Sequence, residues 1–157
     1  MDLKNEYIYG KETYQKKVVE EAKRDGLREF IPYVEQISSD SVKDFTWTCL
    51  ENAPKYFWVI PAAVSEKRHP PFAHDFGGLK RHTIAAHYFG DNLCKAFDVE
   101  GVARDLILCA IDLHDTCKKG VKEYDEKYYR LHHILPRLRY EKYIQRHISP
   151  RRFNAVM

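Results

Sequence analysis

The side chains with the clearest chemical potential in this sequence are histidines and one aspartate near the expected ends of helices. Imidazole nitrogens and carboxylate oxygens bind a divalent metal ion (Mn, Fe, Ni, Zn, Co or Mg) when rigid elements make them converge. Adjacent helical residues point about 100° apart, so two neighbours can share one ion only near a helix end, where the backbone is freer. The candidate ligands are His82, His114, Asp115, His133 and His147.

Two motifs distinguish these residues from ordinary histidines, which taken singly are more often surface or hydrogen-bonded core residues. Gly77 begins the pattern GGL-x-x-HT, which contains His82, and about thirty residues later His114 begins HD-x-x-K, which ends at Lys118. Together the motifs resemble the HD-domain superfamily of metal-dependent phosphohydrolases. Small, mostly uncharacterised HD-domain proteins of phages and Firmicutes are the most similar, because they also match residues 61–63 and 67–70. The resemblance covers roughly residues 55–148.

The resemblance implies a set of metal ligands. His82 is the first ligand, and His114 with Asp115 forms the defining pair, in which Asp115 can bridge two ions. His133 matches a family histidine that begins a later helix, although His132 competes with it for this role.

The resemblance also assigns ligands nearer the C-terminus. His147 matches the histidine that ends the following helix. The family pattern then closes with an aspartate on a further helix, whereas no aspartate follows Asp125 here. Glu141 or water can take that place, the site can hold its metal more weakly, or the domain can have lost catalysis. We therefore expect an HD domain that is shortened at its C-terminus.

The implied reaction is hydrolysis of a phosphate monoester or diester in a nucleotide or nucleic acid. One or two divalent ions activate a water molecule, and Asp115 orients or deprotonates it. Lys118, Lys119 and Arg81 bind the phosphate, although the two lysines can instead simply complement a helix dipole. The alternative is a catalytically degenerate HD domain that binds a nucleotide, nucleic acid or protein, in regulation or phage counter-defence.

Other histidines and tyrosines have weaker patterns. We expect the loop residues His69 and His74 to face solvent at the mouth of the site rather than bind metal, and His87 to be structural. Tyrosines beside lysine and arginine near residues 122–130 can stack on a nucleobase or pack on the core.

Length and composition favour one folded domain. A chain of 157 residues with 44% hydrophobic and 31% charged residues can bury one core. We expect an all-α, compact single-domain helical bundle, with N-terminal helices in residues 1–54 packing on an HD domain in residues 55–157. Neither a signal peptide nor a membrane span is expected. Four cysteines without C-x-x-C spacing indicate reduced core thiols and hence a cytoplasmic protein.

Charge is distributed unevenly along the chain. From Thr116 onward there are 11 Lys and Arg against 4 Asp and Glu, whereas residues 1–115 have 15 against 19. Such a basic segment is either a solvated face or a surface that attracts a phosphorylated small molecule or nucleic acid.

Periodicity and helix stop signals predict the following elements. We expect no strand. The expected helices are residues 11–23 stopped by Asp25-Gly26, a helix from Ser39 or Asp40 to residues 52–54, one from residue 79 to near Gly90, one from Gly101 that delivers His114, and one over residues 131–147 interrupted by Pro136.

Overall fold

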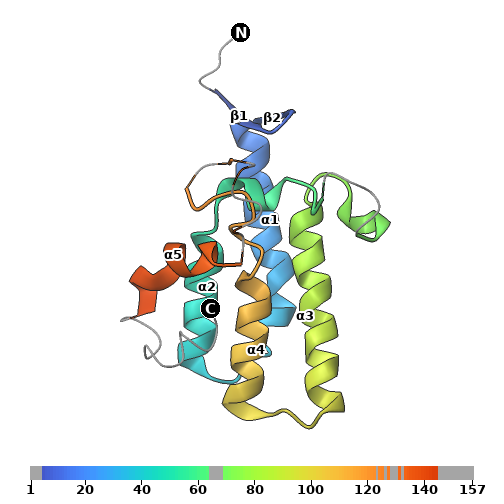
Figure 1. Ribbon diagram of the computed structural model, residues 1–157, viewed down its shortest axis with the longest axis vertical. Coiled ribbons are helices and arrows are strands. Elements are labelled where there is room, and N and C mark those ends of the chain that lie inside the picture. The colour runs from blue at the N-terminus through green and yellow to red at the C-terminus, as the bar shows by residue number, and fades with distance from the viewer. Residues whose placement is uncertain are drawn as a thin grey trace.

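The computed structural model describes residues 5–63, 69–122, 124–125, 127, 131 and 133–144, and it is mostly helical (Figure 1). This confirms the mainly helical class. The elements are β1 (Glu6–Tyr9), β2 (Glu12–Gln15), α1 (Lys16–Val34), α2 (Asp40–Glu51), α3 (Gly78–Ala96), α4 (Gly101–Leu113) and α5 (Leu135–Tyr140), with 3-10 helices η2 (Lys55–Trp58), η3 (Pro71–Ala73) and η5 (Glu141–Tyr143).

The four long helices lie side by side around one hydrophobic core (Figure 1). Helix α4 packs against both α2 and α3, while α1 packs against α2, α3 and η2. The short helix η2 supplies the large buried side chains Tyr56, Phe57 and Trp58. Since burial of large apolar side chains is the main favourable term in folding, this irregular segment is central to the core rather than a surface loop.

A β-hairpin precedes the helices, so the expectation of no strand is wrong. Strands β1 and β2 pair antiparallel, with Tyr7 opposite Tyr14, across a two-residue turn in which Gly10 adopts a φ of 66°. Glycine at the first position of such a turn is typical of hairpins. Tyr7 and Tyr9 lie on the same face of β1, and their rings stack with centroids 5.8 Å apart. The residue between them, Ile8, is apolar but exposed, so the sequence of this four-residue strand does not alternate between apolar and polar residues.

Helix α1 begins later and ends later than predicted, because Asp25-Gly26 does not stop it. Gly26 is buried inside the helix, and a Cβ there would lie 2.6 Å from the ring of Trp58. Glycine at this position lets the helix pack closely on η2. That packing outweighs the cost of glycine inside a helix, about 1 kcal/mol relative to alanine. Helix α1 thus continues to Val34.

Helix α3 also passes through its expected stop, near Gly90, and ends at Ala96. A Cβ on Gly90 would lie 2.2 Å from Cδ1 of Ile111 on α4. Next to it, Asp91 accepts hydrogen bonds from the Arg104 guanidinium of α4, at 2.5 and 2.8 Å. The two helices therefore meet most closely where the sequence suggested an end.

The remaining elements follow the predictions more closely. Helix α2 begins at Asp40 after the N-cap residue Ser39, and the backbone N–H groups of Ser38 and Ser39 donate to the Asp105 carboxylate of α4, at 3.1 and 2.9 Å. Helix α4 begins at Gly101 as expected. Pro136 lies in the first turn of α5, so it begins this helix rather than interrupting it.

The cysteines and the long helices match two further expectations. Cys49, Cys94, Cys109 and Cys117 are all free and buried. In the part of the chain that the structure describes, no helix has the length and apolar character needed to cross a bilayer.

Candidate metal centre

The GGL-x-x-HT motif places His82 in the second turn of α3. Gly77 precedes the helix in a left-handed conformation with φ of 71°, which glycine adopts readily. Gly78 has no room for a side chain, because a Cβ there would lie 2.3 Å from the carbonyl oxygen of Ala73. The N–H groups of Gly77 and Leu79 donate to carbonyls of the buried segment after η2, at 2.8 and 3.0 Å. The double glycine thus fixes the start of α3 against the core.

The HD pair follows α4 directly, where the backbone leaves regular helical geometry. Asp115 is buried, with 3% of its surface exposed, whereas His114 is exposed. Nδ1 of His114 lies 2.6 Å from the carbonyl oxygen of Ile111. Because a carbonyl can only accept, Nδ1 carries the proton, and Nε2 of the neutral ring keeps its lone pair for a metal ion.

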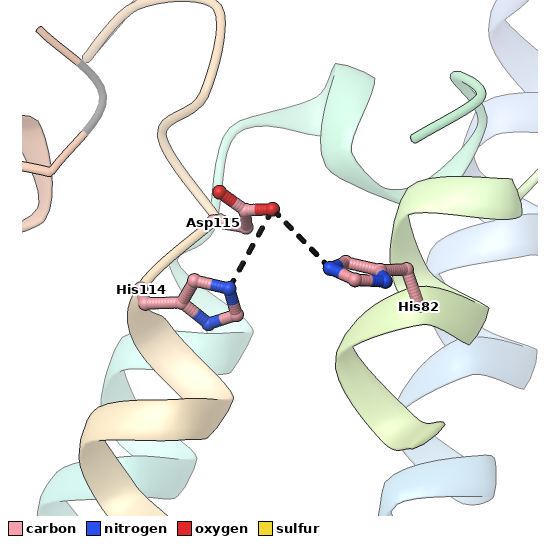
Figure 2. A group of neighbouring side chains, drawn as sticks. All are labelled: His82, His114 and Asp115. Carbon is pink, nitrogen blue, oxygen red and sulfur yellow. Dashed lines mark ion pairs between the residues drawn. The ribbon is translucent and has the colours of Figure 1, made fainter. Parts of the chain in front are cut away.

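The three side chains converge from α3 and from the end of α4 (Figure 2). Oδ2 of Asp115 lies 3.8 Å from Nε2 of His82 and 3.6 Å from Nε2 of His114. Among the described residues, one ligand atom from each of the three lies within 4.8 Å of the others.

These distances fit one divalent ion. Two atoms each about 2.1 Å from an ion are at most about 4.2 Å apart, so each imidazole can share an ion with the carboxylate with little movement. Three protein ligands with remaining open positions are typical of catalytic rather than structural sites.

The protonation state of His82 also suits metal binding. Burial lowers the pKa of His82 from its ordinary value of 6.5, and the charge of Asp115 only partly opposes this effect. Its imidazole is therefore neutral at pH 7, which is the form that binds metal.

Lys118, the lysine of HD-x-x-K, is buried against the same carboxylate. Its Nζ donates to Oδ2 of Asp115 at 2.8 Å, and the two side chains are 6% and 4% exposed. An ammonium group thus already neutralises Asp115 next to the imidazoles. A helix C-terminal lysine that merely faced solvent would not have this geometry.

The other two predicted phosphate ligands lie differently. The Arg81 guanidinium donates to the carbonyls of Phe72 and Phe76 and pairs with Asp75, so it braces the loop before α3. Nζ of Lys119 lies over the ring of Tyr124, 5.9 Å from its centroid. Their roles in substrate binding stay predictions.

The predicted C-terminal ligands do not join this cluster within the described residues. His133 is exposed shortly before α5, and Glu141 is exposed in η5. His132 and His147 lie outside the described residues. Their proposed roles as ligands stay predictions.

His69 lies closer to the site than its loop position indicated. Its ring packs edge-on against that of His82, with centroids 4.6 Å apart. Burial and the charge of Lys118 lower the pKa of His69. Nε2 of His74 donates to the His69 carbonyl at 2.6 Å and so holds this loop in place. The proline-flanked sequence around His69 predicted an irregular loop but not its direction.

A second imidazole–carboxylate pair lies deeper between α3 and α4. Nδ1 of His87 lies 2.8 Å from Oδ1 of Asp112, and both side chains are fully buried. Burial raises the pKa of Asp112, while the hydrogen bond from His87 opposes the rise. The structural role expected for His87 fits this position, whereas no motif predicted that Asp112 is its partner.

Comparison of the chain with protein families, curated proteins and solved structures finds no match. The two motifs and the geometry of the site are therefore what indicate its chemistry.

Proposed function

We propose that this chain is an HD-type, metal-dependent phosphohydrolase acting on a phosphate ester of a nucleotide or nucleic acid. The observation that carries the proposal is the convergence of His82, His114 and Asp115, which come from two separate motifs, with the motif lysine Lys118 on the same carboxylate. Chance histidines would not be expected to converge on a buried aspartate in this way.

Each residue has a distinct task in the proposed site. A divalent cation there supplies Lewis acidity and lowers the pKa of water toward neutrality. His82 and His114 present neutral Nε2 lone pairs to the cation, and the hydrogen bond to Ile111 holds the His114 ring in the required tautomer. Asp115 contributes an anionic oxygen and accepts a hydrogen bond from the attacking water.

Lys118 acts through its charge in a water-poor position. Its ammonium group is held 2.8 Å from Asp115, beside the proposed cation and hence beside a phosphate bound to it. Placing a fixed positive charge where negative charge develops favours the transition state over the ground state. Its burial strengthens that interaction, because the local dielectric constant is low.

The test is metal-dependent hydrolysis of p-nitrophenyl phosphate, bis-p-nitrophenyl phosphate and mononucleotides. Purified protein is stripped with EDTA and reloaded separately with Mn, Co, Ni or Mg. We expect activity with at least one metal, roughly one bound ion or two per chain, and loss of activity by a factor of about 100 or more in His114→Gln. His114 is exposed, so this variant should fold.

A second aspartate serves as a control that separates loss of the metal centre from the general effect of removing a carboxylate. Asp115→Asn should lose both metal and activity, whereas Asp44→Ala, which changes an exposed aspartate on α2, should keep both. Metal bound stoichiometrically without hydrolysis of any substrate would favour the degenerate, ligand-binding HD domain. Failure to bind any metal would overturn the proposed centre itself.

A further inference from the structure

A half-open groove lies beside the β-hairpin, and its lining residues include none of the candidate metal ligands. Its volume is about 700 Å³, within the range of roughly 300–1,000 Å³ typical of ligand-binding clefts. Strand β1, the end of α2, η2 and the segment after α4 all contribute to its walls. The residues that matter most for its chemistry are Tyr7, Tyr9, Tyr124, Lys23, Lys122 and Arg139.

Tyrosine rings line one side of the groove. Tyr9 is the centre of this group: its ring centroid lies 5.7 Å from that of Tyr124, and 6.1 Å from that of the buried Tyr56. Tyr7 stacks on Tyr9, and both are half-buried. The rings are thus packed from behind while part of their surface stays accessible. Such rigid aromatic surfaces are what nucleobases stack on in single-strand-binding proteins.

Positive charges surround these rings. Nζ of Lys23 donates to the Glu51 carbonyl at 2.6 Å, and the Arg139 guanidinium donates to the Asn52 carbonyl. Both cations are held by neutral backbone oxygens, so these bonds orient the charges without cancelling them. Lys122 also lines the groove and is exposed.

The groove also has acidic residues, but the cations outnumber them. Glu6 and Glu51 line it beside Lys23, Lys55, Lys122 and Arg139. Lys55 is paired with Glu20, so it adds little net charge. The groove therefore combines aromatic surface with an excess of positive charge, which suits a polyanion that carries planar bases and not a purely apolar ligand.

A continuous segment connects the groove with the metal centre. The hydroxyl of Tyr56 accepts the Lys119 N–H at 3.1 Å and donates to the Gly120 carbonyl at 2.6 Å. Lys118, one residue before, is bonded to Asp115. The same six residues thus connect the metal centre at one end with Tyr56, which lines the groove, at the other.

We propose that this groove binds single-stranded nucleic acid, with bases on Tyr9 and Tyr124 and phosphates on Lys23, Lys122 and Arg139. Binding there does not require hydrolysis at the metal centre. If the phosphohydrolase proposal is also correct, the groove makes a polynucleotide strand, rather than a free mononucleotide, the substrate class. The two proposals can fail separately, because binding is measured without metal.

The experiment measures fluorescence anisotropy of labelled oligo(dT) and oligo(U), about 12 nucleotides long, with the full chain in EDTA. We expect binding that weakens as salt rises from about 50 to about 200 mM. Lys122→Ala should weaken it several-fold and reduce its salt dependence. Tyr9→Leu should weaken it roughly tenfold while the salt dependence stays nearly unchanged.

Two matched variants and two ligands act as controls. Lys95→Ala and Tyr88→Leu change an exposed lysine and an exposed tyrosine of α3 outside the groove, and both should bind like the unchanged chain. An abasic oligonucleotide of equal charge and a polyglutamate peptide should bind at least tenfold more weakly. Equal binding of either ligand, or equal losses in groove and control variants, would overturn the proposal. Absence of oligonucleotide binding would do the same. Lys122 is exposed, so that variant stays informative even if Tyr9→Leu destabilises the hairpin.

Discussion

Lys118→Met tests whether the buried ammonium group compensates Asp115 where a metal ion would bind. Both side chains are at most 6% exposed, and their charged atoms are 2.8 Å apart. Removing one partner of such a pair leaves a buried charge without that compensation, which destabilises proteins by about 3–5 kcal/mol. We expect a loss at the lower end of this range, about 3 kcal/mol in the free energy of unfolding at pH 7.5.

A divalent ion should reverse most of this loss. At a metal concentration of about 100 times Kd, binding to the folded state alone adds about 2.7 kcal/mol. The unchanged protein should gain less, since its ion must share Asp115 with the Lys118 ammonium. Removing this lysine should therefore tighten metal binding while it abolishes the proposed contact with phosphate.

Urea unfolding followed by circular dichroism, in EDTA and in MnCl2, measures both effects. Lys118→Met combined with Asp115→Asn should regain stability in EDTA and lose its response to metal. Lys95→Met is the control, because Lys95 is 65% exposed and its pair with Asp91 should contribute at most about 1 kcal/mol. The reasoning is refuted if Lys118→Met in EDTA is as stable as the unchanged chain, or if metal stabilises both equally.

Three further predictions concern the surroundings of the site. His87→Leu should cost about 3 kcal/mol in urea unfolding, because it leaves the buried Asp112 carboxyl without its hydrogen-bond partner. His87→Leu with Asp112→Leu should cost much less, since the double change removes both buried polar groups; equal losses would contradict this. Gly78→Ala should lower the free energy of unfolding by about 3 kcal/mol, because the added Cβ meets a backbone carbonyl. Gly101→Ala should lower it by only about 1 kcal/mol, because that position has space for a Cβ although its φ is 59°. Similar shifts in melting temperature for the two variants would argue against the steric explanation. In metal-free protein, the free energy of unfolding should fall as pH decreases below 6.5, because the folded state holds the His82 pKa below that of the unfolded chain. His82→Gln should make this fall shallower. Identical pH profiles for the variant and the unchanged chain would contradict the attribution of the fall to His82.

The candidate metal centre could be predicted because its residues belong to local motifs. GGL-x-x-HT and HD-x-x-K each specify a helix terminus together with the side chain that it presents. The structure brings His82, His114 and Asp115 together as the pair of motifs implies. The surroundings could not be predicted in the same way. The His69 ring reaches His82 from a loop, and the depth at which Lys118 is buried depends on the packing around it.

The glycines show why several element boundaries were wrong. Gly26 and Gly90 both have the local signature of a helix stop, yet both lie inside helices. What decides their role is a partner distant in sequence, Trp58 for the first and Ile111 for the second. Glycine costs about 1 kcal/mol relative to alanine inside a helix, and this cost is smaller than the gain from close helix packing, so the tertiary contact decides the outcome.

The sequence by itself determined the helical class, the burial of the cysteines and the three residues of the candidate metal centre, because helical periodicity and short motifs are properties of neighbouring residues. Only the tertiary structure decided how deeply Lys118 and Asp115 are buried, the pairing of His87 with Asp112, and the assembly of the tyrosine groove. Burial, charge compensation and cavity shape arise where distant segments meet, so no local pattern encodes them.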